Sequence, residues 1–177
     1  MFGHFYNESI RKLVVAFGSM FNDIRIESVN SAGQTEETRL PLSYGPKEKY
    51  MRRIEEQSSI SNSGKVLITL PRLGFNITNM TYDSTRKRNT LQKRRTTPSG
   101  ASGGIMSYAY SEVPYNFEFS LYGFVRNMND ALQISEQILP YFTPEFNVTM
   151  NFNDLNKTVD IPIVLNSVNM EEDYEGD

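Results

Sequence analysis

The sequence predicts an α+β fold, in which a mainly antiparallel sheet has about three helices packed on it and carries a long basic hairpin loop. Several stretches alternate apolar and polar residues with the period of two that strands require, and three others repeat apolar residues every three or four positions. Their order is helix, hairpin, helix, long hairpin, helix, hairpin, which is typical of α+β domains. With 177 residues, 38% of them apolar, the chain can build one core, so we expect a single domain over residues 1–169.

The N-terminal third is expected to form a helix and a hairpin. A helix from about residue 7 to 20 is predicted by apolar residues at helical spacing, although Gly18 weakens its end. This stripe consists of Ile10, Leu13, Val14, Phe17 and Phe21. Residues 24–29 then alternate as a strand, a polar run follows, and residues 38–42 return as the hairpin partner.

A second helix and a long strand come next. The helix is expected over residues 46–57, because Pro46 is well suited to a first helical position and apolar residues mark one face of the segment after it. Residues 66–83 alternate as a strand that Pro71 interrupts. Since proline has no backbone N–H to donate, Pro71 indicates an edge position or a bulge.

The C-terminal part has the strongest strand signal, over residues 115–125, followed by a helix over 127–140. Alternation places the odd-numbered aromatic residues in the core, namely Tyr115, Phe117 and Phe119. Asn127 or Asn129 can cap the helix, and Asp130 adds a negative charge at its N-terminal end. Its buried stripe is expected to be Met128, Ala131, Leu132, Ser135, Ile138 and Leu139. A last hairpin is predicted from residues 146–152 and 159–165.

Charge is unevenly distributed, although the formal net charge is only −3. Residues 72–95 contain seven basic side chains and one acidic one, whereas the last eight residues contain five acidic side chains and no basic one. Residues 84–104 contain only one large apolar residue, Leu91. Because this segment is long and has little to bury, we expect it to form a flexible basic arm. Residues 170–177 are expected to form an acidic tail. Such blocks seldom fold alone and often serve as contact arms.

The residue types argue against an enzyme. Without cysteine there is no thiol nucleophile and no zinc-thiolate site, and His4 is the single histidine. The carboxylate pairs at residues 36–37 and 55–56 are adjacent in sequence, so their side chains point in different directions. A hydrolase would need two carboxylates that converge in a pocket. We therefore expect no catalytic residues, no cofactor and no metal, and no apolar run is long enough to span a membrane.

The basic arm is the main candidate for binding a partner. Its candidate residues are Arg86, Lys87, Arg88, Lys93, Arg94 and Arg95. We favour an acidic protein surface as the partner of these charges, or a plain solvated loop, over the phosphates of a nucleic acid. In the nucleic-acid alternative the chain is an α+β module that binds through residues 86–95. Open strand edges near Pro71 and Pro114 are a further candidate surface for strand addition.

Four stretches together resemble the tail sheath stabilizer and completion proteins of contractile-tailed bacteriophages. They are MFGHFYNESIRK, LPLSYGPKEKYMRR, LPRLGFNITNMTYDSTRK and VPYNFEFSLYGFVRNMNDALQISEQILPYFTPEFNVTMN. The resemblance implies a structural virion protein without enzymatic activity, assembled in the cytoplasm of the host bacterium. It implies a homo-hexameric ring that caps the head-proximal end of the tail, in its neck region. In this family the ring contacts the sheath, the tube terminator and the neck of the capsid, and DNA passes through it.

Ring closure requires two different patches that bind each other on neighbouring copies. We expect the helix at residues 127–140 or the adjoining strands to supply part of this contact. Its candidate residues are Asn127, Asp130, Gln133 and Glu136. Family members usually continue past the segment that matches residues 161–177, so the sequence either is a shortened form or belongs to an unusually short member. The basic arm is expected to reach outside the ring, to sheath or neck.

Overall fold

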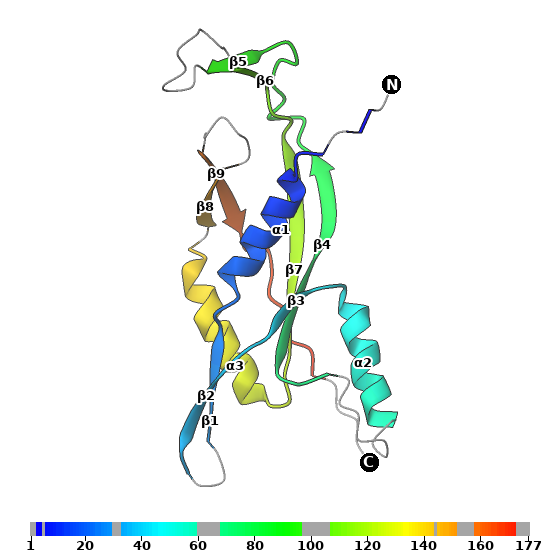
Figure 1. Cartoon of the computed structure of the whole chain (residues 1–177). Helices are drawn as coiled ribbons and strands as arrows, with labels where there is room; N and C mark the ends of the chain where they lie inside the picture. Colours follow the sequence, from blue (N-terminus) through cyan, green and yellow to red (C-terminus); the bar gives the residue numbers. More distant parts are fainter. Residues whose placement is uncertain are drawn as a thin grey trace.

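The computed structural model describes residues 3–4, 6–29, 33–59, 68–96, 107–143, 145–151 and 158–172. The helices are α1 (Ser9–Met20), α2 (Lys47–Ser59) and α3 (Met128–Ile138), and the 3-10 turn η1 (Leu139–Tyr141) continues α3. The strands are β1 (Arg25–Val29), β2 (Thr35–Arg39), β3 (Leu42–Tyr44), β4 (Arg72–Tyr82), β5 (Lys93–Thr96), β6 (Ser107–Tyr110), β7 (Tyr115–Phe124), β8 (Glu145–Asn151) and β9 (Thr158–Val164). Figure 1 shows an elongated molecule with β4 and β7 along its length. The predicted α+β class is confirmed.

The strands form several small sheets. β4 is the middle strand of a three-stranded sheet, in which it pairs antiparallel with β7 and parallel with β3. The parallel pair follows from the connection, because α2 carries the chain from β3 back to the start of β4. β1–β2, β5–β6 and β8–β9 are separate antiparallel pairs. Three hairpins therefore surround one central sheet, where the sequence predicted one mainly antiparallel sheet.

The two faces of the central sheet are covered by different helices. Alternation along β4 turns Leu73 and Phe75 to one face and Gly74 to the other. On the first face Phe17 of α1 packs against Phe75, and Ile134 of α3 belongs to the same cluster. The buried residues of this core are Phe17, Phe21, Ile24, Ile26, Leu40, Leu73, Phe75 and Ile134. On the opposite face α2 packs its Tyr50 against the aromatic residues of β7, Tyr122 and Phe124.

Aromatic residues of β7 differ in burial along the strand. The Phe119 ring stacks on Phe17 with 4.4 Å between ring centroids, as expected of a core residue. Phe117 is half-buried, but Tyr115 is 49% exposed, so its predicted place in the core is wrong. Its ring instead packs edge-on against Tyr82 of the paired strand, at 5.6 Å. Strand alternation predicts which face a residue shares, but not how far along the strand the covering helices extend.

Two predicted boundaries are wrong for identifiable reasons. The partner of β1 is β2, residues 35–39, whereas residues 42–44 form β3 in the central sheet. The chain changes sheets at Leu40 and Pro41, because the Leu40 N–H donates to Ile24 O and the Pro41 carbonyl accepts from Leu73 N–H. The expected long strand starts only at Arg72, directly after Pro71, and its bulge lies between Ile77 and Asn79. Residues 66–67 lie outside the described residues.

Gly18 does not end α1, which continues to Met20. The Phe75 ring lies directly over Gly18, and a Cβ on this glycine would be 3.0 Å from Phe75 Cζ. The glycine thus lets the helix approach the sheet closely. None of the described helices has the length and apolar character needed to cross a membrane.

Candidate interaction surfaces

The predicted basic arm is the continuation of the β4–β7 ribbon. Beyond the ends of these strands, Asp83 N–H donates to Pro114 O at 3.1 Å and Ser111 N–H donates to Gln92 O at 3.0 Å. β5 and β6 then pair in register, and residues 83–92 and 111–114 link this hairpin to β4 and β7 (Figure 1). The expectation of a loop over residues 84–104 is therefore wrong where β5 forms. Residues 97–104 lie outside the described residues.

Ion pairs hold the joint between the two parts of this ribbon. Arg86 Nε donates to Asp83 Oδ2 at 2.6 Å, and a terminal nitrogen of the same guanidinium donates to Asn116 Oδ1. Arg88 pairs with Glu112 at 3.3 Å. These two arginines, which the sequence proposed for binding a partner, connect the two strands of the ribbon to each other.

The carboxylate of Asp83 provides a pH test of this joint. Hydrogen bonds from Thr85 and Arg86 hold the pKa of Asp83 well below its usual range. A carboxyl group with a lowered pKa in the folded state stabilises the fold above its ordinary pKa of about 4, and this contribution is lost as pH falls toward the native pKa. We expect an NMR titration of the Asp83 carboxyl carbon to show a midpoint well below the ordinary value of about 4.

Substitution of each arginine in turn tests whether Arg86 causes the lowered pKa of Asp83. Arg86→Gln is expected to raise the midpoint of Asp83, because it removes a charged donor to this carboxylate. Arg88→Gln removes a cation from the same joint, but one that pairs with Glu112, and should leave the midpoint of Asp83 unchanged. A midpoint near pH 4 in the unmodified protein would contradict the assigned hydrogen bonds.

One face of the β5–β6 hairpin combines cations with tyrosines. Lys93 is opposite Tyr110 and Arg95 is opposite Tyr108 in the register, so the four side chains share a face. Lys93 Nζ lies 5.3 Å from the Tyr108 ring centroid and 5.1 Å from that of Tyr110, within cation–π range. Both rings are more than 60% exposed. We call these four residues the tyrosine–cation face. Arg94 belongs to the other face, and its side chain lies outside the described residues.

Three of the predicted basic residues remain available for a partner. Within the described part of the chain, Lys87, Lys93 and Arg95 are exposed and make no ion pair.

The helix α3 has three distinct faces. Its core face carries Ile134 and Ile138, which pack into the central cluster. A second face carries an exposed apolar stripe at helical spacing. The stripe consists of Met128, Leu132 and Leu139, whose exposed fractions are 48%, 44% and 41%. The prediction that these three residues are buried is wrong, because the core reaches only the face centred on Ile134.

The third face of α3 holds the free edge of β1 through two glutamines. Gln133 Oε1 accepts from Glu27 N–H at 2.9 Å, and Gln133 Nε2 donates to Glu27 O at 3.2 Å. Gln137 makes the same pair of bonds with Arg25, at 3.3 and 2.6 Å. Side chains four apart on a helix match strand residues two apart, because both spacings are about 6–7 Å. The two amides thus act like a neighbouring strand and cover an edge that would otherwise be open.

The four residues that the sequence proposed on this helix occupy different environments. Asn127 is the N-cap, as one of the two alternatives predicted, but its side chain makes no capping hydrogen bond. Asp130 lies in the first turn, and Gln133 is engaged with β1. Only Glu136 is exposed beside the apolar stripe. The exposed apolar stripe of Met128, Leu132 and Leu139 indicates an interface more strongly than these four polar residues do. Sequence periodicity alone assigned the stripe to the core.

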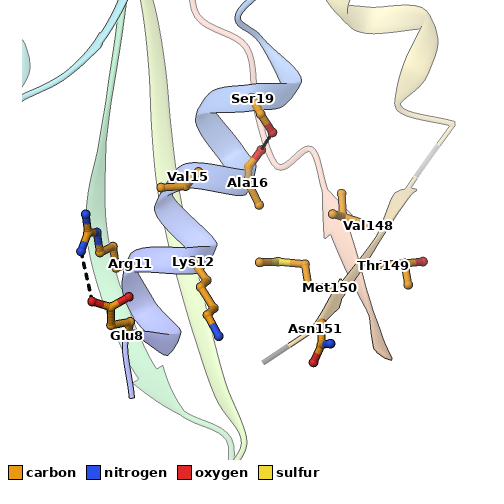
Figure 2. Close-up of a pocket in the computed structure, with 10 residues that line it drawn as sticks. All are labelled: Glu8, Arg11, Lys12, Val15, Ala16, Ser19, Val148, Thr149, Met150 and Asn151. Atoms are coloured by element: carbon orange, nitrogen blue, oxygen red, sulfur yellow. Dashed lines mark hydrogen bonds and ion pairs between the residues drawn. The ribbon is translucent and has the colours of Figure 1, made fainter. Parts of the chain in front are cut away.

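A shallow cleft of about 500 Å³ lies between α1 and β8. Figure 2 shows its two sides, with side chains of α1 on one and side chains of β8 on the other. The lining residues are Glu8, Arg11, Lys12, Val15, Ala16, Ser19, Val148, Thr149, Met150 and Asn151. Among the described residues that line it, Glu8 is the one carboxylate, and it is paired with Arg11 at 3.1 Å. This described lining does not supply the two converging carboxylates that the hydrolase interpretation requires.

A second hollow follows one face of α2 and does contain two carboxylates, Glu48 and Glu56. They are eight residues apart on one helix, which separates them by about 12 Å along its axis. Paired carboxylates that act on one glycosidic bond lie about 5–9.5 Å apart, and this backbone spacing does not by itself place the two glutamates as such a pair. Within the described residues, no three histidine or acidic side chains gather closely enough to hold a metal ion.

Comparison with known proteins agrees with the resemblance found in the sequence. The family model of the T4-like virus Myoviridae tail sheath stabiliser matches residues 4–177. The chain belongs to this family. It is also 36% identical over 183 aligned positions to the tail completion protein gp15 of Enterobacteria phage T4. That alignment covers the whole chain and 66% of the T4 protein, so the chain spans just under two thirds of its curated relative.

The family is that of the tail sheath stabilisers of myoviruses, which are structural proteins of the phage tail. The tyrosine–cation face and the apolar stripe of α3 are the two exposed candidate surfaces described above.

Proposed function

We propose that six copies of this chain form a ring that caps the head-proximal end of the tail in its neck region. The ring stabilises the extended sheath, because it supplies the contacts that the last sheath subunits lack. The family match carries this proposal, together with the resemblance to tail completion proteins. In it the ring also contacts the tube terminator and the neck proteins, and DNA passes through its centre. Assembly takes place in the host cytoplasm, and the chain makes and breaks no covalent bonds.

Six identical copies convert weak contacts into firm attachment. After one copy engages a six-fold target, each further copy binds at a high effective concentration. The ring itself needs a heterologous contact, in which one patch binds a different patch on the next copy. A permanent contact of this kind buries on the order of 1,600 Å² or more. Residues 1–169 form the domain that is repeated, and the acidic segment of residues 170–177 extends from it.

The apolar stripe of α3 is the best candidate for part of the ring contact. Its residues lie on the solvent side of a helix whose other two faces are occupied by the core and by β1. Exposed apolar side chains at the centre of an interface, with polar residues at its rim, are typical of stable subunit contacts. Glu136 beside the stripe is such a rim residue.

Leu132→Glu tests the ring. Because Leu132 is 44% exposed, the variant should fold normally, but a charge placed in an apolar contact disfavours association. We expect native mass spectrometry to show six-subunit rings for the unmodified protein and predominantly monomers for the variant. Tails assembled with the variant should fail to complete.

A matched control places the same charge on another exposed apolar residue. Val29 of β1 is 72% exposed and lies outside the stripe, so Val29→Glu should leave the ring intact. Rings that persist in Leu132→Glu would rule out the stripe as a subunit contact. An unmodified protein that stays monomeric at every concentration would instead contradict the ring.

The nucleic-acid alternative for residues 86–95 receives less support from the side chains. Arg86 and Arg88 are already paired with the carboxylates of Asp83 and Glu112. Fewer cations are therefore available to neutralise phosphates than the sequence suggests. A protein partner needs only a few well-placed contacts, which the tyrosine–cation face can supply.

A further inference from the structure

We infer that the tyrosine–cation face of β5–β6 binds the acidic segment of residues 170–177 of a neighbouring copy. This inference rests on the proposed ring, and it names a binding partner for the tyrosine–cation face at the end of the β5–β6 hairpin. The segment carries five negative charges and no positive one, and one of the five, Glu171, is paired with Lys47 of its own copy. Lys93 and Arg95 present two positive charges on one face of the tip. The chain thus carries both halves of a complementary pair.

The tip has the features of a binding surface. Tyr108 and Tyr110 are 62% and 63% exposed, and Lys93 lies between their rings. Tyrosine and arginine are enriched among the residues that contribute most to interface affinity. A two-stranded hairpin away from the core is also marginally stable by itself. A bound segment would cover the exposed rings and stabilise the hairpin.

Within one copy the length of β4 separates the two halves, because Gly45, just before α2, bonds Phe75, and the strand from there to Tyr82 spans about 23 Å. Figure 1 shows β5–β6 at one end of the molecule and α2 in the opposite half. Lys47, the first residue of α2, bonds Glu171 at 2.6 Å and so fixes where the acidic segment leaves the body. The six residues after Glu171 span at most about 20 Å when fully extended.

Complementary patches at separate places on one chain suit a ring. Such patches produce a heterologous contact, in which every copy gives one patch and receives the other. The expected partner of the basic arm changes accordingly, from sheath or neck to the next copy. The acidic side chains that the basic arm needs in a partner are present in residues 170–177 of this chain.

Charge reversal in the full-length chain tests the contact. Lys93→Glu with Arg95→Glu should raise the dissociation constant between copies on the order of a hundredfold, because like charges then face each other. Glu172→Lys with Glu175→Lys should weaken association to a similar degree. All four changes in one chain should restore it, because each reversed patch meets a reversed neighbour. Sedimentation at low and physiological salt measures these constants, and the unmodified contact should weaken as salt rises.

A control and a direct assay complete the test. Arg52→Glu with Arg53→Glu makes the same change of charge on the exposed surface of α2 and should not affect association. A synthetic peptide of residues 170–177, added to the unmodified chain, should shift the ring resonances of Tyr108 and Tyr110, but not in the variant with reversed Lys93 and Arg95. This assay remains informative even if the chain proves monomeric and the ring proposal fails.

Three results would overturn the inference. The first is unchanged association after reversal of Lys93 and Arg95, with no response to the peptide. The second is normal self-association of this variant combined with failure of tail completion, which would assign the face to sheath or neck. The third is binding of duplex DNA that the reversal abolishes while the peptide has no effect, which would assign the face to nucleic acid.

Discussion

Phe17→Ala is expected to lower the free energy of unfolding by about 3–5 kcal/mol, the usual cost of removing a buried phenylalanine ring. Phe17 is 9% exposed and lies where α1 meets the central sheet. Its ring is 5.0 Å from Phe21, 5.3 Å from Phe75 and 4.4 Å from Phe119, measured between centroids. Loss of this ring leaves a cavity that three aromatic neighbours cannot fill. Urea unfolding followed by circular dichroism measures the change.

A matched substitution on the same helix gives the control. Val15 is 62% exposed, so Val15→Ala removes little buried surface and should change stability by less than about 0.5 kcal/mol. Equal effects of the two substitutions would mean that α1 is not packed on the sheet through Phe17. Such a result would contradict the core assignment from which the ribbon and the hairpins are positioned.

Local patterns in the sequence predicted most elements, because each depends on residues close in the chain. The helical spacing that ends in Phe17 predicted α1, and alternation through Phe119 predicted β7. The errors arose where contacts between segments distant in sequence determine which sheet a strand joins. Pro41 and Leu73 lie far apart in sequence, yet their hydrogen bond draws residues 42–44 into the central sheet as a parallel strand.

In the candidate interfaces too, local sequence reveals which residues are present, whereas long-range contacts determine which of them are exposed and unpaired. Six basic residues were visible in the sequence, but only the fold shows that Arg86 and Arg88 pair with carboxylates of the ribbon. Periodicity also placed Leu132 in the core, because a helix with two apolar faces has the same spacing as a helix with one broad face. The hydrogen bond between Gln133 and β1 orients the helix and so decides which of its apolar residues face the core. No local sequence pattern reveals this long-range bond.

The fold explains how a small chain can present several separate contact surfaces. One compact core holds α1 and α3 on the central sheet, while the β1–β2 and β5–β6 hairpins extend from it (Figure 1). Substitutions at exposed hairpin residues should therefore affect assembly more than folding, whereas substitutions at the sheet should affect folding first.

Gly74→Ala is expected to destabilise the fold by about 1–3 kcal/mol, the usual cost of inserting a methyl group into a packed site. Gly74 lies on the α2 face of the sheet, directly opposite Tyr122. A Cβ at this position would be 2.5 Å from Tyr122 Cε2 and 3.0 Å from Tyr50 Cε2. Tyr50 is 3% exposed and anchors α2, so neither ring can move without loosening this helix.

A second substitution tests whether the clash is the cause. Burial of Tyr122, together with its neighbour Tyr50, raises its pKa to about 12, in agreement with a ring enclosed at this site. Tyr122→Leu removes the ring that a methyl group would meet, so Gly74→Ala should cost less in the Tyr122→Leu background, with a coupling energy of at least about 0.5 kcal/mol. Gly3→Ala, with no atom of the described residues within 4 Å of its Cβ, should be neutral. Strictly additive effects of Gly74→Ala and Tyr122→Leu would show that the methyl group does not meet this ring, and α2 would then have to be held against the sheet in another way.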